Sequence, residues 1–138
     1  MKTAGYSGTP LEKKLGLKEG FVIKLINIPE YYFNLFQELP AGLVQQEDGT
    51  IEKDFIHFFT KSTKVLESGL LKYIKEIKQN GMIWVSWPKK ASKVPTDVTE
   101  DVIRNLALSM GLVDVKVCAV DKTWSGLKLV IPVKNRKK

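Results

Sequence analysis

Apolar positions along this chain follow two patterns, continuous runs and runs with helical spacing. Three continuous runs have the composition of strands that are covered on both faces, namely 21–27, 54–60 and 82–87. In other segments apolar residues recur every three or four positions, which is typical of amphipathic helices, namely 30–39, 62–79 and 96–111. The alternation predicts strands connected by helices, including an aromatic-rich helix over 30–39 that packs on a sheet.

Capping signals set the expected ends of the helices. The pattern at 9–12 predicts a short helix, capped by Thr9 with Glu12 as its capping-box partner, that stops at Gly16. The pair Asn80-Gly81 supplies the stop expected just past the helix over 62–79. The candidate caps of the two later helices are Ser62 or Thr63, and Thr96 or Thr99.

Two weaker patterns predict further strands. A short strand is expected over 43–47, before a turn at Asp48-Gly49. Near the end of the chain, 113–120 and 127–133 flank a connection at 121–126 and predict a hairpin. In its first strand, alternation places Val113, Val115, Val117 and Ala119 on one face and Asp114, Lys116 and Cys118 on the other.

This order of elements predicts the fold class. Strands separated by helices favour a three-layer, Rossmann-like, mostly parallel α/β sheet with helices on both faces, here closed by a C-terminal antiparallel β-hairpin. The chain has 138 residues, of which 43% are hydrophobic and 27% charged, enough for one globular core. We expect a single domain over 1–133 and a basic tail over 134–138.

The net charge of +7 comes from two short segments. The tail carries four positive charges and the loop after Trp87 carries three, which leaves 15 basic and 15 acidic residues elsewhere. We expect the tail to be solvated and frayed. The charge therefore points to anion binding at one loop rather than to a generally basic surface.

Several classes of protein are excluded or disfavoured. One cysteine, Cys118, rules out an intramolecular disulfide, and His57 is the only histidine, so no Cys/His zinc site can form. No clustered carboxylate motif proposes a metal. No apolar signal core or membrane-spanning run is present, so we expect a cytoplasmic protein without a membrane partner.

The segment after the first strand argues against a nucleotide cofactor. Sites of this fold that hold a dinucleotide or S-adenosylmethionine normally place closely spaced glycines there. Residues 26–32 contain no glycine, and Pro29, Tyr31 and Tyr32 would fill the space. A P-loop and a nucleophile elbow are absent as well. We therefore expect no cofactor and no catalytic residue.

A ligand site is expected at the carboxyl ends of the strands, where loops of an open α/β sheet bind ligands. The loop 87–93 is the best candidate, because three lysines and a serine stand there before a helix whose free amides attract anions. Phosphate, nucleic acid or an acidic protein surface could bind it, although loop lysines are often only solvated. The candidate binding residues are Asn27, Ser62, Trp87, Lys89, Lys90, Ser92, Lys93, Thr96 and Trp124.

Other conspicuous residues have structural interpretations. His57 shares a face with Phe55 and Phe59, so a neutral, hydrogen-bonded histidine is expected rather than a general base. Cys118 is expected to behave as a small apolar residue. Trp84 and the run Tyr31-Tyr32-Phe33 are expected in the core. Trp124, in the hairpin connection, could cover the sheet end or stack on a ring.

The chain resembles a bacterial family of domains of unknown function (uncharacterised family 3052). The resemblance rests on 15–20, on Gly81-Met82-Ile83-Trp84 with the following Pro88-Lys89, and on 121–130, the most specific segment. Segments 87–100 and 111–120 resemble a recurrent subset of that family. The resemblance implies a Rossmann-like, methyltransferase-like fold, and the succession of strands and helices with its closing hairpin is itself similar to the later half of a class I methyltransferase-type Rossmann fold. It implies no activity and no catalytic residues.

Three functions remain open. The first is a non-catalytic Rossmann-like module that binds an anionic small molecule, nucleic acid or another macromolecular partner through the loop 87–93. The second is a diverged S-adenosylmethionine-dependent methyltransferase-like enzyme that lacks the glycine motif. The third is a small interaction or oligomerisation protein, including a homodimer that pairs through its hairpin edge or aromatic helix.

Overall fold

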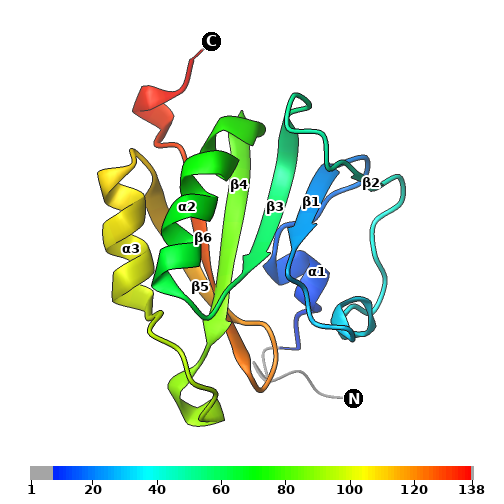
Figure 1. Cartoon of the computed structure of the whole chain (residues 1–138). Helices are drawn as coiled ribbons and strands as arrows, with labels where there is room; N and C mark the ends of the chain where they lie inside the picture. The colour runs from blue at the N-terminus through cyan, green and yellow to red at the C-terminus, as the bar shows by residue number, and fades with distance from the viewer. Residues whose placement is uncertain (1–7, 138) are drawn as a thin grey trace.

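The computed structural model describes residues 8–137, which form one sheet with helices on both faces (Figure 1). The strands are β1 (Val22–Ile26), β2 (Val44–Gln45), β3 (Lys53–Phe59), β4 (Ile77–Pro88), β5 (Val113–Ala119) and β6 (Trp124–Val130). The α-helices are α1 (Leu11–Lys14), α2 (Thr63–Tyr73) and α3 (Glu100–Ser109). Single 3₁₀ turns are η1 (Tyr32–Leu35), η2 (Ile74–Glu76), η3 (Lys90–Ser92) and η4 (Val133–Asn135).

The sheet has six strands in the order β2-β1-β3-β4-β6-β5. Strands β2, β1, β3 and β4 are parallel, whereas β6 is antiparallel to both of its neighbours. This arrangement confirms the predicted fold class, a mostly parallel α/β sheet closed by an antiparallel hairpin. None of the helices within residues 8–137 combines the length and the apolarity needed to cross a membrane.

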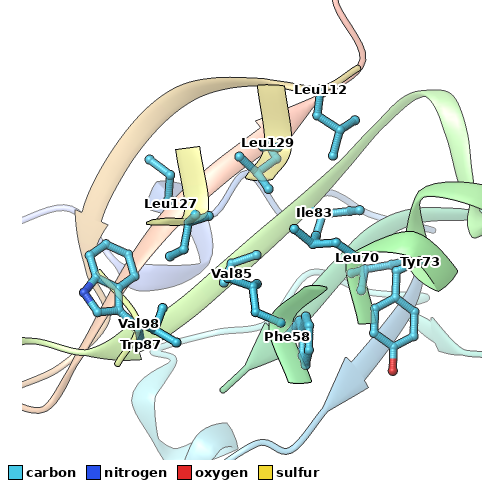
Figure 2. Close-up of a cluster of buried hydrophobic side chains, with 14 of the residues drawn as sticks. Phe58, Leu70, Tyr73, Ile83, Val85, Trp87, Val98, Leu112, Leu127 and Leu129 are labelled. Carbon is cyan, nitrogen blue, oxygen red and sulfur yellow. The ribbon is translucent and has the colours of Figure 1, made fainter. Parts of the chain in front are cut away.

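Two apolar cores lie on opposite faces of the sheet. Helices α2 and α3 cover one face, where side chains of β3, β4 and β6 meet residues such as Leu70 (Figure 2). The short α1 and η1 cover the other face, where Leu15, Tyr32 and Trp84 are buried. The Trp84 indole N–H donates to the Leu15 carbonyl at 2.8 Å and ties α1 to β4. Trp84 is therefore a core residue, as the sequence predicts.

The aromatic segment 30–39 is not the helix that its spacing predicts. Only η1 forms, and at Phe36 the backbone is already extended, with φ −97° and ψ 143°. The backbone N–H groups of Gln37 and Glu38 donate to the carboxylate of Glu12, at 3.2 and 2.8 Å, instead of continuing a helix. Glu12 therefore does not act as the capping-box partner expected for α1.

The same segment corrects the expected core. Tyr32 is buried, but Tyr31 and Phe33 are 40% and 45% exposed. A single 3₁₀ turn with extended backbone on its C-terminal side points only one of the three rings at the sheet. The prediction that the whole run is buried was therefore wrong for Tyr31 and Phe33.

The long helix predicted over 62–79 ends early, and Asn80-Gly81 is not its stop. α2 begins at its cap Ser62, whose hydroxyl accepts from the Val65 N–H, and it ends at Tyr73. β4 then starts at Ile77, which pairs with Lys53, before a register shift. Gly81 lies in this irregular stretch of β4, where a Cβ would come within 2.9 Å of the Lys53 carbonyl. A glycine is required there by close backbone packing, not by a helix end.

The closing hairpin is tighter than predicted. Trp124 is the first residue of β6 and pairs with Pro88, so it does not lie in the connection. The Asp121 carboxylate shapes the turn by accepting from the N–H groups of Thr123 and Trp124, both at 2.8 Å. The hairpin therefore extends to the very end of β4.

A β-bulge in β5 breaks the predicted alternation of side chains. Asp114 pairs with Leu129 and Lys116 with Lys128, so Val115 is an extra residue at the register shift. Because Leu129 and Lys128 point to opposite faces, Asp114 and Lys116 do so too, although alternation places them together. β5 is an edge strand of the sheet, and Val115 is largely exposed.

The basic tail, expected to be frayed, makes contacts as far as the structure describes it. Arg136 donates through Nε to the Ile131 carbonyl at 3.0 Å, and the Lys137 N–H donates to the Gln79 side chain at 2.8 Å. Lys138 lies outside the described residues. The charges of this segment are therefore placed near the start of β4, at the end of the sheet away from the predicted ligand loop.

Candidate functional site at the carboxyl edge of the sheet

The carboxyl edge is the end of the sheet where β1, β3 and β4 finish. The first residues beyond this edge include Asn27 after β1, Thr60 after β3 and Lys89 after β4. Trp124, at the start of β6, lies at the same edge because it pairs with Pro88. β2 lies on one side of β1, and β3 and β4 lie on the other side. The direction in which successive strands are added to the sheet therefore reverses between β1 and β3. In open α/β sheets the ligand crevice lies at such a point. The expected site residues therefore gather at the end of the sheet where the fold places ligands.

The crevice at this point is closed by side chains. Asn27, in the left-handed region with φ 58°, donates through its side-chain amide to the Phe59 carbonyl at 3.3 Å. The rings of Phe59 and Trp124 meet edge to face, 5.0 Å between centroids. Burial, together with a hydrogen bond from the hydroxyl to Asp121, raises the pKa of Tyr31 to about 12. Phe59 and Trp124 thus pack against each other at this end of the sheet, with the partly exposed Tyr31 beside them.

A buried polar chain lies on the same face of the sheet. His57 is fully buried and lies 2.9 Å through Nδ1 from the Tyr32 hydroxyl and 2.8 Å through Nε2 from the Ser86 hydroxyl. Burial lowers the pKa of His57 to about 3, so the imidazole is neutral. Asp54 points elsewhere and accepts from the Val22 N–H. With no access to a substrate, His57 serves to satisfy two buried hydroxyls.

The loop 87–93 is tied to the core at its start and presents lysines after that point. Trp87 is only 8% exposed and packs beside Val98 in the core under α2 and α3 (Figure 2). It anchors the loop and does not offer its ring to a ligand, which corrects its place among the candidate binding residues. The Ser92 hydroxyl donates to the Lys89 carbonyl at 2.7 Å. Lys90 and Lys93 are exposed, and Lys89 is half-buried.

Side chains of the protein cap the first turns of both α2 and α3. Asp97 accepts from the Thr63 N–H at the start of α2, at 2.8 Å, and Ser62 caps the same turn. Thr99, not Thr96, caps α3, and the Thr96 hydroxyl donates to the Lys61 carbonyl at 2.7 Å. The Ser62 hydroxyl therefore caps its own helix, and the Thr96 hydroxyl connects the loop after β3 to the segment before α3.

Two lysines that the sequence analysis did not select join this edge. Lys61 follows β3, and its carbonyl accepts from Thr96 at the end of the lysine loop. Lys122 lies in the β5–β6 turn. The Lys89 backbone N–H donates to the Thr123 carbonyl in this turn at 2.8 Å, which places the turn beside the lysine loop. Both are exposed. Their positions directly after β3 and within the hairpin turn are the only signals in the sequence that could have selected them.

Cys118 is half-buried in β5, and burial raises the pKa of its thiol, an effect that the nearby charges of Lys14 and Lys116 only partly oppose. A thiol with a raised pKa is a weak nucleophile at neutral pH, because the thiolate is the reactive form. Cys118 therefore shows no sign of activation.

Three solved structures have a similar fold. A protein assigned as a type 11 methyltransferase from Sulfolobus solfataricus has a TM-score of 0.62 at 12% identity, with 93% of each chain covered. A SAM dependent methyltransferase from Aquifex aeolicus has 0.58 at 16%, covering 88% of this chain and 87% of that one. Ribosomal protein L11 methylase from Lactobacillus delbrueckii subsp. bulgaricus has 0.55 at 9%, covering 91% and 74%. These likenesses show a methyltransferase-like Rossmann fold, and the fold alone.

No curated protein matches this chain. A family profile does match it, over residues 34–133, a range that includes the segments at 81–84 and 121–130 on which the family resemblance rests. The chain therefore belongs to the family described as protein of unknown function (DUF3052).

Proposed function

We propose that this protein is a non-catalytic binding module that engages an anionic partner through the loop 87–93 and the loop ends beside it. The observation that carries the proposal is a group of lysines at the carboxyl edge, none of which forms an ion pair within residues 8–137: Lys61, Lys89, Lys90, Lys93 and Lys122. The nearby carboxylates of Asp97 and Asp121 accept from backbone N–H groups instead. The edge therefore presents positive charge to solvent.

The closed crevice supports a binding role over a cofactor-dependent one. S-adenosylmethionine is the group that the methyltransferase-like fold implies, and the residues present do not fit it. No glycine lies over 26–32, the rings of Phe59 and Trp124 pack against each other at this edge, and the Tyr31 hydroxyl reaches Asp121 beside them. We therefore derive no reaction through that cofactor.

The distribution of the lysines favours an extended partner. They come from three separate segments, the loop after β3, the loop after β4 and the β5–β6 turn, which the Thr96 and Thr123 contacts hold together. Separated charges on projecting loops suit a chain of phosphates better than a single enclosed anion. Binding of this kind weakens steeply with salt, because it releases counterions from the polyanion.

Titration of the ¹⁵N-labelled protein with a single-stranded DNA oligonucleotide tests the proposal. We expect shifts at 61, 87–93 and 122 that disappear in the triple variant Lys89→Ala, Lys90→Ala, Lys93→Ala. The matched control is Lys72→Ala, Lys75→Ala, Lys134→Ala, which removes the same charge from exposed positions away from the carboxyl edge. An equal loss in both variants, or no shifts in the native protein, would overturn the proposal.

Calorimetric titration with S-adenosylmethionine distinguishes the proposed binding module from the second candidate, a diverged methyltransferase-like enzyme. We expect no measurable heat of binding, because the aromatic side chains would have to leave the switch point. Tight binding of the cofactor would overturn the closed-crevice argument and favour the enzyme.

A further inference from the structure

A second group of lysines lies away from the carboxyl edge, on the sheet face that α1 partly covers. We call it the hairpin lysine cluster, which consists of Lys14, Lys18, Lys116 and Lys128. Lys116 of β5 and Lys128 of β6 are direct cross-strand partners, and Lys128 also pairs with Trp84 of the core under α1. The Lys116 ammonium donates to the Lys14 carbonyl at 3.1 Å, at the end of α1. The cluster therefore joins the helix end to the hairpin.

The cluster has no internal counter-charge. None of its four lysines forms an ion pair with a carboxylate of the described residues. Like charges directly opposite one another on neighbouring strands destabilise a sheet. Burial lowers the pKa of Lys128, and the positive charges of Lys116 and Lys18 lower it further.

The lysines of the cluster differ in how far they are exposed to solvent. α1 is only four residues long and ends at Lys14, so Lys116 beyond it is exposed, while Lys128 is half-buried beside Trp84. Direct cross-strand neighbours have Cβ atoms about 5 Å apart. The charges of Lys116 and Lys128 are thus concentrated in a small area, in which Lys128 is the less accessible of the two.

We propose that the hairpin lysine cluster binds a compact polyanion of the oligophosphate class. Several negative charges within one small ligand match several ammonium groups within one small area, and a slim ligand reaches the half-buried Lys128. Lysine-to-phosphate contacts are charge-assisted and are stronger than neutral hydrogen bonds. This site does not rest on the function proposed for the carboxyl edge, because the two groups of lysines share no residue.

Cys118 provides a reporter inside the cluster. It lies two positions after Lys116 in β5, on the same face, and it pairs with Gly126, two positions before Lys128 in β6. It is the only cysteine in the chain. Its alkylation by iodoacetamide, followed by mass spectrometry, therefore reports on this face alone.

The experiment uses inorganic tripolyphosphate as the probe, with the alkylation rate and calorimetry as readouts. We expect tripolyphosphate to slow alkylation of Cys118 in the native chain and in the control variant Lys89→Gln, Lys90→Gln. In Lys116→Gln or Lys128→Gln the affinity should fall about tenfold, the equivalent of one charge-assisted hydrogen bond. Lys116→Arg keeps the charge and should keep binding, which separates lost charge from a disturbed fold.

Three outcomes would overturn the inference. The first is no protection of Cys118 and no heat of binding with tripolyphosphate. The second is binding that persists in the hairpin variants and is lost in the Lys89→Gln, Lys90→Gln control, which would place the anion at the carboxyl edge and support the function proposed there. The third is protection of Cys118 by a single-stranded oligonucleotide but not by tripolyphosphate, which would replace the compact ligand by an extended one.

Discussion

Two pairs of lysines lie on this sheet in opposite surroundings. Lys24 of β1 and Lys53 of β3 are buried, and both ammonium groups contact the same carboxylate oxygen of Glu76, at 3.0 and 2.9 Å. Lys116 and Lys128 face each other across the hairpin with no carboxylate of the described residues between them. The comparison shows that a carboxylate neutralises lysine where the fold buries it, whereas the more exposed hairpin pair has no carboxylate partner among the described residues.

The buried pair shows what full compensation requires. Besides Glu76, Lys53 donates to the Asp48 carbonyl at 2.6 Å, and the Lys24 ammonium lies 5.1 Å from the centre of the Tyr73 ring. Within residues 8–137, no buried side-chain nitrogen or oxygen lacks a hydrogen-bond partner. The interior therefore has its polar groups matched, and the hairpin lysine cluster departs from this rule at the surface.

The largest expected effect comes from removing the shared carboxylate. Glu76→Gln leaves two buried lysines without a counter-charge, which should lower the free energy of unfolding by about 3–5 kcal/mol. Urea unfolding followed by circular dichroism measures it. The control Glu67→Gln changes an exposed residue of α2 and should alter stability by less than about 0.5 kcal/mol.

The same triad predicts a pH dependence with a definite sign. Burial raises the pKa of Glu76, but the hydrogen bonds and charges of Lys53 and Lys24 lower it further, so the net pKa lies below its usual value. The resulting stabilisation is present above the pKa of the unfolded chain and is lost as the pH falls through the folded value. The Glu76→Gln variant should lack this pH-dependent part of the unfolding free energy. The same loss of stability at acid pH in both proteins would contradict the role of Lys24, Lys53 and Glu76.

An effect of intermediate size on the free energy of unfolding is expected from His57, the buried histidine whose ring nitrogens both have hydrogen-bond partners. Its folded pKa of about 3 lies below the unfolded value of 6.5, so only the unfolded chain gains a proton between these values. The free energy of unfolding should therefore decrease as the pH is lowered, by about 2 kcal/mol between about pH 7 and about pH 5. Urea unfolding across this range measures it. His57→Gln should flatten the slope, and an unchanged slope would show that another group titrates.

The smallest effect is expected at the unmatched pair. Lys116→Gln removes one of two opposed charges and should raise the free energy of unfolding by about 0.2–1 kcal/mol at low ionic strength. At about 1 M salt the gain should vanish, because the repulsion is screened. Lys90→Gln, an exposed lysine of the carboxyl edge, is the control. A gain that persists in salt would show that Lys116 acts through packing rather than charge.

The sequence predicts the framework well because strand signals are local. The buried runs at 21–27, 54–60 and 82–87 all became strands, and their order with the hairpin was sufficient for the fold class. The segment 30–39 failed for a non-local reason. Its apolar spacing is helical, but Glu12, distant in sequence, takes the backbone N–H groups of Gln37 and Glu38.

The candidate site was predicted only in part, because strand direction is a local signal whereas side-chain packing is not. The carboxyl edge follows from strand direction, so the loop lysines could be placed there from the sequence. Trp87 could not be assigned correctly, because its burial depends on Val98, which follows the loop and packs back on it. The meeting of Lys116 with Lys128 depends on a one-residue register shift, which no pattern of apolar residues reveals.

The bulge at Val115 also interrupts the hydrogen-bonding edge that β5 presents at the side of the sheet. In a regular strand, the sequence Val113-Asp114-Val115-Lys116-Val117 would be self-complementary in antiparallel pairing, with Asp114 opposite Lys116 of a second copy. The register shift turns Asp114 towards α3, where it accepts from Arg104 Nε at 2.9 Å, and turns Lys116 to the other face. An interrupted edge is a poor template for another strand. The residue that brings two lysines together thus also interrupts the free edge of the sheet.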